Sequence, residues 1–292
     1  MPRPRALLLL ALLGPVLTAP ALRADTPPGP GASASADAPD EPPPPPALPD
    51  EPSDPGADDD TSWCAPGLDT LADHVCAHVP ATFAPGPRTL VIFLHGVIKP
   101  GLGWQRNQQL AARRVAATAG VAALMPRGRR GVGPKGMEDW YTWPARPAHA
   151  SIEAEVIAEW THAKEALEAR LGQPFERVWV FGFSNGAYYA TSLALQGRLT
   201  APPLRVDGFA VFAGGSAAPY IEKAARHTST RRPLFVGWGG RDPDHRNQQR
   251  LASMLRRLRW PSASEGAPKA GHVMTDHAAA SAVKFLRTVK KP

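Results

Sequence analysis

One five-residue segment, Gly182-Phe183-Ser184-Asn185-Gly186, constrains the fold of this chain more than any other feature. The run before it, 178–181, is β-branched and aromatic without a charge, which predicts a short buried strand. The run after it, 187–197, predicts a helix that ends at a glycine. A serine in such a tight strand-to-helix turn has an exposed hydroxyl, and the flanking glycines let the strand and helix backbones approach closely. The segment therefore predicts an α/β domain with a nucleophilic serine at position 184.

Strands and helices alternate along the rest of the domain. Apolar runs predict strands at 89–94, 121–125, 206–212 and 234–238, and amphipathic runs predict helices at 108–118, 152–171, 247–257 and 276–289. Ser151 is the expected N-cap of the second of these helices. Strands that alternate with helices of about ten or more residues are typical of a mostly parallel sheet covered on both faces. We therefore predict an α/β fold.

The first 61 residues are not expected to belong to the folded domain. Arg3 and Arg5 precede a short apolar run and then small residues, which together predict a secretory signal peptide over 1–24. Residues 25–61 contain ten Asp and Glu, many prolines and no Lys or Arg, so we expect a disordered linker there. We expect the protein to be exported, to the periplasm or outside the cell, with an uncleaved N-terminal anchor as the alternative.

The remaining residues, 62–292, are enough for one sizeable catalytic domain. They hold 30 Lys and Arg against 16 Asp and Glu, so a basic domain follows an acidic leader. The basic residues gather in one loop and on one predicted helix: Arg127, Arg129, Arg130 and Lys135, and Arg250, Arg256, Arg257 and Arg259. Such patches either attract an anionic polymer, membrane surface or acidic substrate, or form a solvated face. No interleaved aromatic stripe accompanies them, so nucleic-acid binding is not expected.

The two cysteines, Cys64 and Cys76, both precede the first core strand. In an exported chain, an even number of cysteines this close together predicts a disulfide. Such a bond would fix the start of the domain and stabilise it by on the order of 3 kcal/mol. No redox spacing and no H-E-x-x-H motif occurs in the sequence, so we expect neither a metal nor catalytic thiols.

A serine hydroxyl needs a base to remove its proton and an acid to hold that base. In this kind of sheet the chain order is Ser, then Asp or Glu, then His. Asp242 follows the strand 234–238 and a glycine-rich turn, where catalytic groups gather beyond the carboxyl ends of parallel strands, and Asp244 is the alternative. His272 lies in a loop before the last helix, from which an imidazole can reach back over the sheet. We expect Ser184, His272 and Asp242 to form a catalytic triad.

The tetrahedral intermediate of such a reaction needs two N–H donors for its oxyanion. The amide of Asn185, directly after the serine, is the first expected donor. The second is the amide of Val97, in the loop after the strand 89–94. His95 lies in the same loop but precedes the serine, and we expect it to brace the loop rather than to act as the base.

The long loop 126–150 is expected to line the substrate cleft. It carries Trp140, Tyr141 and Trp143 close together, and bulky aromatic residues in a loop either cap the core or form a pocket wall. We assign these three side chains to substrate binding. Trp104 and Trp238, near the two ends of the expected cleft, are further candidates.

Four motifs in this order resemble those of the α/β-hydrolase superfamily: LHG after the first core strand, GFSNG at the turn, GGRD after a late strand, and GH before the final helix. The run PRGRRGVGPKGMEDWYTWP at 126–144 is similar to a stretch of the phospholipase/carboxylesterase (acyl-protein thioesterase-like) family, and secreted feruloyl esterases and polyhydroxybutyrate depolymerases look similar. The resemblance implies hydrolysis of carboxylic esters or thioesters through an acyl-enzyme, with no cofactor. Asn185, Ala187 and Thr142 depart from the residues usual in these families, which leaves the substrate open.

Three functions are compatible with these residues. The first is a serine esterase that acts on a small or polymeric ester. The second is a polyester depolymerase or a serine peptidase, which would use the same triad. The third is a catalytically silent binding domain at the cell envelope, against which the intact Ser, Asp and His argue. The sequence predicts neither the natural substrate nor the oligomeric state.

Overall fold

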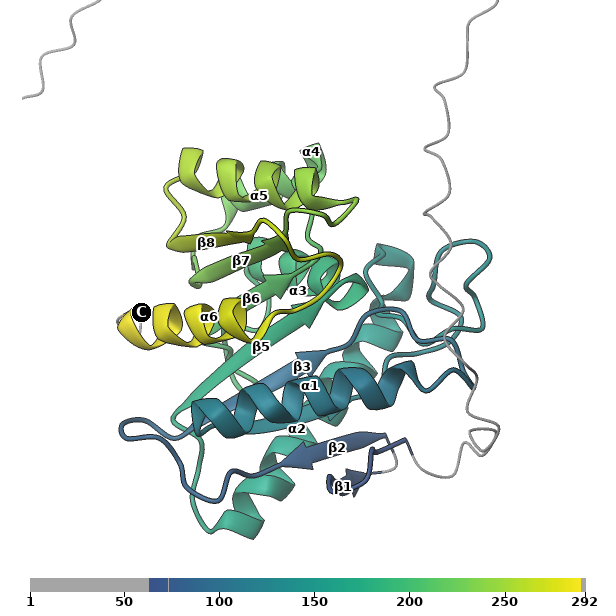
Figure 1. Ribbon diagram of the computed structural model, residues 1–292, viewed down its shortest axis with the longest axis vertical. Helices are drawn as coiled ribbons and strands as arrows, with labels where there is room; N and C mark the ends of the chain where they lie inside the picture. The colour runs from purple at the N-terminus through teal and green to yellow at the C-terminus, as the bar shows by residue number, and fades with distance from the viewer. Residues whose placement is uncertain (1–62, 73, 290–292) are drawn as a thin grey trace, which may run out of the picture. The chain divides into compact units, whose positions relative to one another are not determined.

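The computed structural model describes residues 63–72 and 74–289, which form an eight-stranded sheet with helices on both faces (Figure 1). The expected signal peptide at 1–24 and linker at 25–61 lie outside the described residues. The strands are β1 (Asp69–Ala72), β2 (Val75–His78), β3 (Thr89–Leu94), β4 (Ala122–Pro126), β5 (Arg177–Phe183), β6 (Gly208–Phe212), β7 (Leu234–Gly239) and β8 (Ser262–Ala267). The helices are α1 (Trp104–Ala119), α2 (Ala150–Leu171), α3 (Asn185–Leu195), α4 (Pro219–His227), α5 (His245–Arg257) and α6 (Asp276–Thr288), with a 3-10 turn at Pro147–His149.

The strand order across the sheet is β1-β2-β4-β3-β5-β6-β7-β8. β1 and β2 are antiparallel to their neighbours, whereas each pair from β4 to β8 across the sheet is parallel. The predicted α/β fold with a mostly parallel sheet is therefore confirmed. Because the carboxyl ends of parallel strands meet at one edge, the loops after β3, β5 and β7 come together there.

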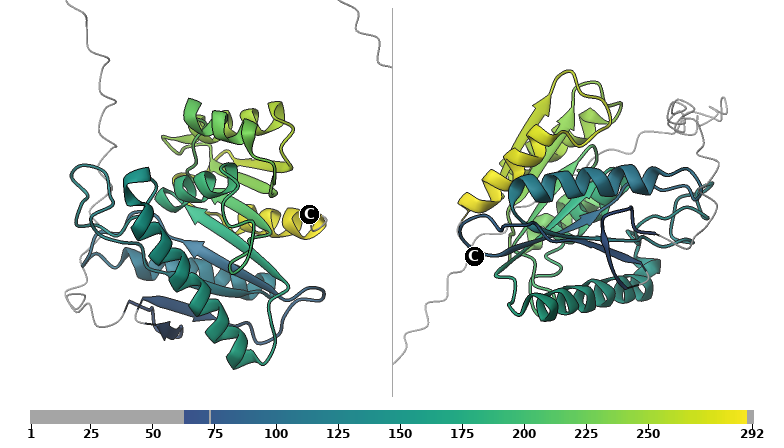
Figure 2. Two further views of the ribbon diagram at one scale, coloured as in Figure 1. Left: turned by 180° about the vertical axis from the view of Figure 1, so that it is seen from behind. Right: turned by 60° about the horizontal axis from the view of Figure 1, so that its bottom comes forward.

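Two hydrophobic layers hold the helices to the sheet. Alternate residues of β3 face opposite sides, so Leu90 and Ile92 pack in the layer under α2, α3, α4 and α5, while Val91 and Phe93 pack in the layer under α1 and α6. The views in Figure 2 show α1 and α2 on opposite faces of the sheet. Strands that are buried on both faces explain the nearly continuous apolar runs in the sequence.

Several elements differ from the predictions. Strands β1, β2 and β8 and helix α4 were not predicted, because their sequences are short or poor in large apolar residues. Helix α2 follows the 3-10 turn and has His149 as its N-cap, so the expectation of a cap at Ser151 is wrong. Helix α1 begins at Trp104, four residues before the predicted start.

Cys64 and Cys76 are joined by a disulfide. Cys76 lies in β2 and is fully buried, so the bond ties the first described residues to the sheet. Among the described residues, no helix has an apolar stretch long enough to cross a bilayer. Residues 63–72 and 74–289 also contain no cluster of His, Cys, Asp and Glu suited to holding a metal ion.

Candidate active site

Ser184 occupies a strained turn between β5 and α3. Its φ of 50° and ψ of −118° lie outside the regions that side-chain-bearing residues favour. The Ser184 amide donates to the carbonyl oxygen of Phe212 at 2.9 Å, which ties the turn to β6. A Cβ at Gly186 would lie 2.2 Å from the backbone oxygen of Leu94, so only glycine lets α3 approach β3 this closely. The packing of three strand ends therefore maintains the strained serine.

A chain of hydrogen bonds connects Ser184, His272 and Asp242. The Oγ of Ser184 lies 2.9 Å from Nε2 of His272, and Nδ1 of His272 lies 3.0 Å from Oδ2 of Asp242. Three segments supply these side chains: the turn after β5, the loop between β8 and α6, and the turn after β7. The structure thus brings together the serine, the imidazole and the carboxylate that the chain order predicted would meet.

Asp242 is almost completely buried, while the side chain of His272 is 35% exposed. Burial alone would raise the pKa of the Asp242 carboxyl, but hydrogen bonds from His272 and from the Asp244 amide outweigh it and lower this pKa. The carboxylate is therefore charged at neutral pH and can hold the Nδ1 proton of the imidazole. Asp244 is exposed at the N-cap of α5, and its backbone amide donates to Asp242, so it supports the acid rather than replacing it.

The other three histidines after Ser184 form no hydrogen bond with its hydroxyl among the described residues. His277 lies 2.9 Å from Glu265 and is mostly exposed. The Nδ1 of His245 contacts the backbone oxygen of Asp242. His227 is exposed at the end of α4.

Two backbone amides near Ser184 have no acceptor among the described residues. One belongs to Asn185, the first residue of α3, where an amide has no partner within the helix. The other belongs to Val97, next to Gly96, whose Cβ position lies 3.0 Å from Cβ of Ser184. The amides beside them are occupied: Gly186 donates to the His95 oxygen, and Gly96 donates to Gln108. Two N–H groups without an acceptor among the described residues thus lie beside the turn that holds Ser184.

Gln108 was not predicted as part of this site. Its Oε1 accepts from the Gly96 amide at 2.7 Å and so holds the loop after β3. The sequence contains no signal for this role, because the contact depends on how α1 packs beside the loop.

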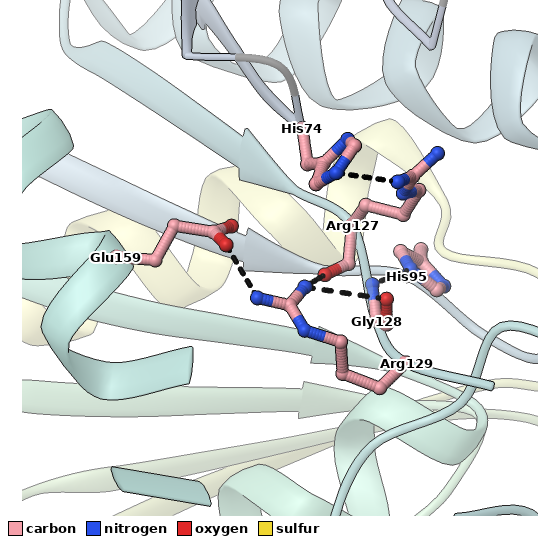
Figure 3. Close-up of polar contacts among 6 residues, drawn as sticks. All are labelled: His74, His95, Arg127, Gly128, Arg129 and Glu159. Carbon is pink, nitrogen blue, oxygen red and sulfur yellow. Dashed lines mark hydrogen bonds and ion pairs between the residues drawn. The ribbon is translucent and has the colours of Figure 1, made fainter. Parts of the chain in front are cut away.

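His95 holds the same loop from inside the domain. It is buried, with a pKa lowered to about 4, mainly by burial. Its Nε2 accepts from the Gly128 amide at 2.9 Å (Figure 3). The proton is therefore on Nδ1, which contacts the Gly96 oxygen. The His95 carbonyl accepts from the indole N–H of Trp143 at 2.8 Å. A buried, neutral imidazole with a hydrogen bond at each ring nitrogen acts as a brace for the loop, as expected from the sequence.

The segment Arg127–Arg129, which follows β4, is itself anchored on two further elements. Nη2 of Arg127 lies 2.7 Å from Nε2 of His74, in the turn between β1 and β2. Arg129 forms an ion pair with Glu159 of α2 (Figure 3). Two of the arginines in the predicted basic loop are therefore engaged within the domain.

The aromatic residues of the long loop are placed differently from one another. Trp143 is 1% exposed and stacks on Tyr189, with ring centroids 6.0 Å apart. Tyr141 is 7% exposed and contacts the ring of Trp63. The assignment of Trp143 and Tyr141 to the wall of an open cleft is therefore wrong, because both side chains belong to the core.

Trp140 is only partly buried and contacts Trp104 edge to face, with ring centroids 5.8 Å apart. Trp238, in β7, is also partly exposed. These three tryptophans remain candidates for contact with a substrate.

A central parallel sheet with a serine at a strand-to-helix turn is the architecture of the α/β-hydrolases. A family model described as Phospholipase/Carboxylesterase matches residues 81–290. Because the match covers most of the chain, this chain belongs to the phospholipase/carboxylesterase family. It is therefore a hydrolase of the esterase and thioesterase class.

Individual relatives share less than a third of their residues with this chain. Acyl-protein thioesterase 1 of Eremothecium gossypii is 29% identical over 174 residues, which are 56% of this chain and 70% of that protein. A variant of SOBER1 from Arabidopsis thaliana superposes with a TM-score of 0.50 at 14% identity, over 68% of this chain and 98% of that one. Acyl-protein thioesterase 2 of Zea mays gives 0.49 at 16% identity, over 73% and 97%. At 14% identity, the superposition with the SOBER1 variant shows the fold alone.

Proposed function

We propose that this chain is an exported serine esterase that works through a Ser184–His272–Asp242 triad and an acyl-enzyme. The observation that carries the proposal is the continuous hydrogen-bond chain from Ser184 Oγ through the imidazole to the buried carboxylate. Family membership supports the ester hydrolase chemistry.

The first half-reaction follows from this arrangement. The Oγ of Ser184 attacks the acyl carbonyl while Nε2 of His272 takes its proton. Asp242 keeps the imidazole in the required tautomer and stabilises the imidazolium that forms. The amides of Asn185 and Val97 donate to the oxyanion of the tetrahedral intermediate. His272 then gives its proton to the leaving alcohol, and the acyl group remains on the serine.

The second half-reaction repeats these steps with water. His272 removes a proton from a water molecule, which attacks the acyl-enzyme, and the carboxylic acid leaves as the serine recovers its proton. No cofactor is needed for either half. His272 is partly exposed, so water can reach its imidazole.

The test is the hydrolysis of an activated short-chain ester, p-nitrophenyl acetate, by the wild type and by Ser184→Ala. We expect kcat to fall by about 10⁴-fold or more, because the members of a triad act as a unit. Ser192→Ala, at a serine inside α3 eight residues after Ser184, is the matched control and should keep full activity. A Ser184→Ala protein that retains most of its activity would refute the proposal.

Export rests on the leader. A positive N-terminal region, an apolar run and small residues precede an acidic segment, and the domain carries a disulfide. Mass spectrometry of the mature protein from its native host should find an N-terminus near residue 25. An N-terminus that still carries residues 1–24 would contradict the proposed signal peptide.

A further inference from the structure

A hollow of about 500 Å³ is lined by residues of α4, of α5 and of the segment before α4. Both helices lie on the face of the sheet that α2 and α3 also cover (Figure 1). Six of the hollow's eight lining residues are polar or charged, and the full lining is Ala217, Glu222, Arg246, Gln249, Arg250, Ser253, Met254 and Arg257. Three of these residues are arginines of α5, spaced four and seven residues apart along the helix. That spacing places them on one face.

The charges of this hollow are unbalanced. Glu222 is the only acid in the lining and already pairs with Arg257 at 2.8 Å and with Arg226 at 2.5 Å. Arg246 and Arg250 are exposed and form no ion pair or hydrogen bond with any residue that the structure describes. Helix α5 itself contains no Asp or Glu from its first residue to its last. The hollow therefore presents two guanidinium groups without an acidic partner.

The position of Arg246 does not serve the stability of the helix. It lies in the first turn of α5, where the helix dipole favours negative charge and disfavours a cation. Arg257 is different, because a cation in the last turn is favourable. Helix α5 therefore contributes no charge that offsets Arg246.

The hollow begins close to the proposed triad. Helix α5 starts three residues after Asp242. On the other wall, Ala217 follows Gly214 by three residues, and a Cβ at Gly214 would lie 2.5 Å from the Ser184 carbonyl oxygen. From there the arginine face runs away from the triad along the helix, over about 16 Å between Arg246 and Arg257 at 1.5 Å per residue.

We propose that this hollow, the α4–α5 groove, binds the chain of an acidic polysaccharide whose ester groups are the substrate. The proposal rests on the proposed esterase function. Spaced carboxylates can pair with the guanidinium groups of Arg246 and Arg250, and hydroxyl groups can bond Gln249 and Ser253. Arg246 and Arg250 lie about one helical turn apart, or about 6 Å along the axis, so they suit two neighbouring charges of a polymer better than a single small anion.

The lining disfavours the other polyanions. None of the groove residues is aromatic, whereas proteins that bind single-stranded nucleic acid stack bases on aromatic side chains. A membrane surface site would need exposed large apolar residues next to the cations, and the one large apolar residue of the groove lining, Met254, is buried. A concave polar groove instead suits one hydrated chain.

Direct binding tests the groove independently of catalysis. Polygalacturonate without ester groups is titrated into the full-length protein at low ionic strength by calorimetry, with wild type and Arg246→Gln/Arg250→Gln compared. We expect Kd to rise about tenfold in the double variant, from the loss of two exposed ion pairs. Added salt should weaken the wild-type interaction.

The chain offers a closely matched control. A second hollow of about 490 Å³ lies between α1 and α6 on the opposite face of the sheet, with Arg114 and Lys284 in its lining. Arg114→Gln/Lys284→Gln removes the same net charge, and its Kd should stay within about twofold of the wild-type value. Equal weakening in both double variants would mean non-specific attraction and would overturn the proposal. So would a wild type that binds anionic phospholipid vesicles but not polygalacturonate.

A comparison of activity on a polymeric ester and on a small ester tests whether the groove binds the substrate. The ratio of kcat/KM on O-acetylated polygalacturonate to kcat/KM on p-nitrophenyl acetate should fall about tenfold in Arg246→Gln/Arg250→Gln. An unchanged ratio would refute the link between groove and substrate. If the wild type hydrolyses neither ester, the esterase proposal fails, and the binding titration still decides whether the groove holds the polymer.

Discussion

His95 should make the stability of the domain depend on pH in a way that one substitution can isolate. Its pKa is about 4 in the folded protein and 6.5 in the unfolded chain. Between these values the unfolded state binds the extra proton and the folded state does not, so the free energy of unfolding falls as the pH is lowered. The contribution is fully present above pH 6.5 and is lost as the pH falls through 4. At about 1.4 kcal/mol per pH unit, the loss is about 3 kcal/mol.

The structural reason is local. Protonation would place an N–H on Nε2, where the Gly128 amide already donates at 2.9 Å, and would leave a buried charge without a counterion. Glutamine at position 95 can still accept from Gly128 through its amide oxygen but cannot take up a proton. We therefore expect His95→Gln to lose the steep part of the pH dependence, whatever its stability at neutral pH.

The assay is urea unfolding of the wild type and of His95→Gln at several pH values between 7.5 and 4. Subtracting the free energy of unfolding of His95→Gln from that of the wild type at each pH removes the contributions of all other titratable groups. His227→Gln, at an exposed position on α4, is the matched control and should run parallel to the wild type. Parallel curves for the wild type and His95→Gln would refute the assignment of His95 as a buried neutral brace.

Three further outcomes follow from the contacts of the described residues. Asp242→Asn should lower kcat on p-nitrophenyl acetate by about 10⁴-fold because the imidazole loses its tautomer, while Asp244→Asn should lower it far less; equal losses in steady-state assays would contradict the geometry. Gly186→Ala would bring its Cβ to 2.2 Å from a β3 backbone oxygen, so α3 must shift and activity should fall at least tenfold, unless a crystal structure of the variant shows the turn unmoved. Cys64→Ser should reduce the free energy of unfolding by about 3 kcal/mol, since the bond to Cys76 closes a short loop; a chemical denaturation curve equal to that of the wild type would exclude this contribution.

Much of the fold could be predicted because its central strands are apolar on both faces. The run at 89–94 coincides with β3, and β5, β6 and β7 lie within two residues of their predicted starts. Strand β8 could not be predicted, since Ser262–Ala267 contains only small residues and one Glu at the edge of the sheet. Helix α4 is short and begins at a proline, so its pattern is too brief to recognise.

Among the residues around Ser184, too, some positions could be predicted from the sequence and others could not. The proximity of Ser184, Asp242 and His272 could be predicted, because strand ends and chain order determine which loops meet in this fold. The positions of Tyr141 and Trp143 could not, since an aromatic residue in a loop can turn inward or outward. The backbone hydrogen bonds between Ile98 and Tyr141 hold the long loop against the segment that follows β3, and the sequence does not reveal this pairing.

The central claim is that His272 activates Ser184 as a nucleophile. Reaction with a fluorophosphonate tests it most directly, since only a serine activated by a neighbouring base reacts quickly with such a probe. The full-length protein and His272→Ala are treated with the probe, and the modified peptide is identified by mass spectrometry. We predict one stoichiometric label on Ser184 in the wild type and at least a hundredfold slower labelling in His272→Ala. A wild type without a label on Ser184 would contradict the assignment of Ser184 as an activated nucleophile. So would a His272→Ala protein that is labelled as fast as the wild type.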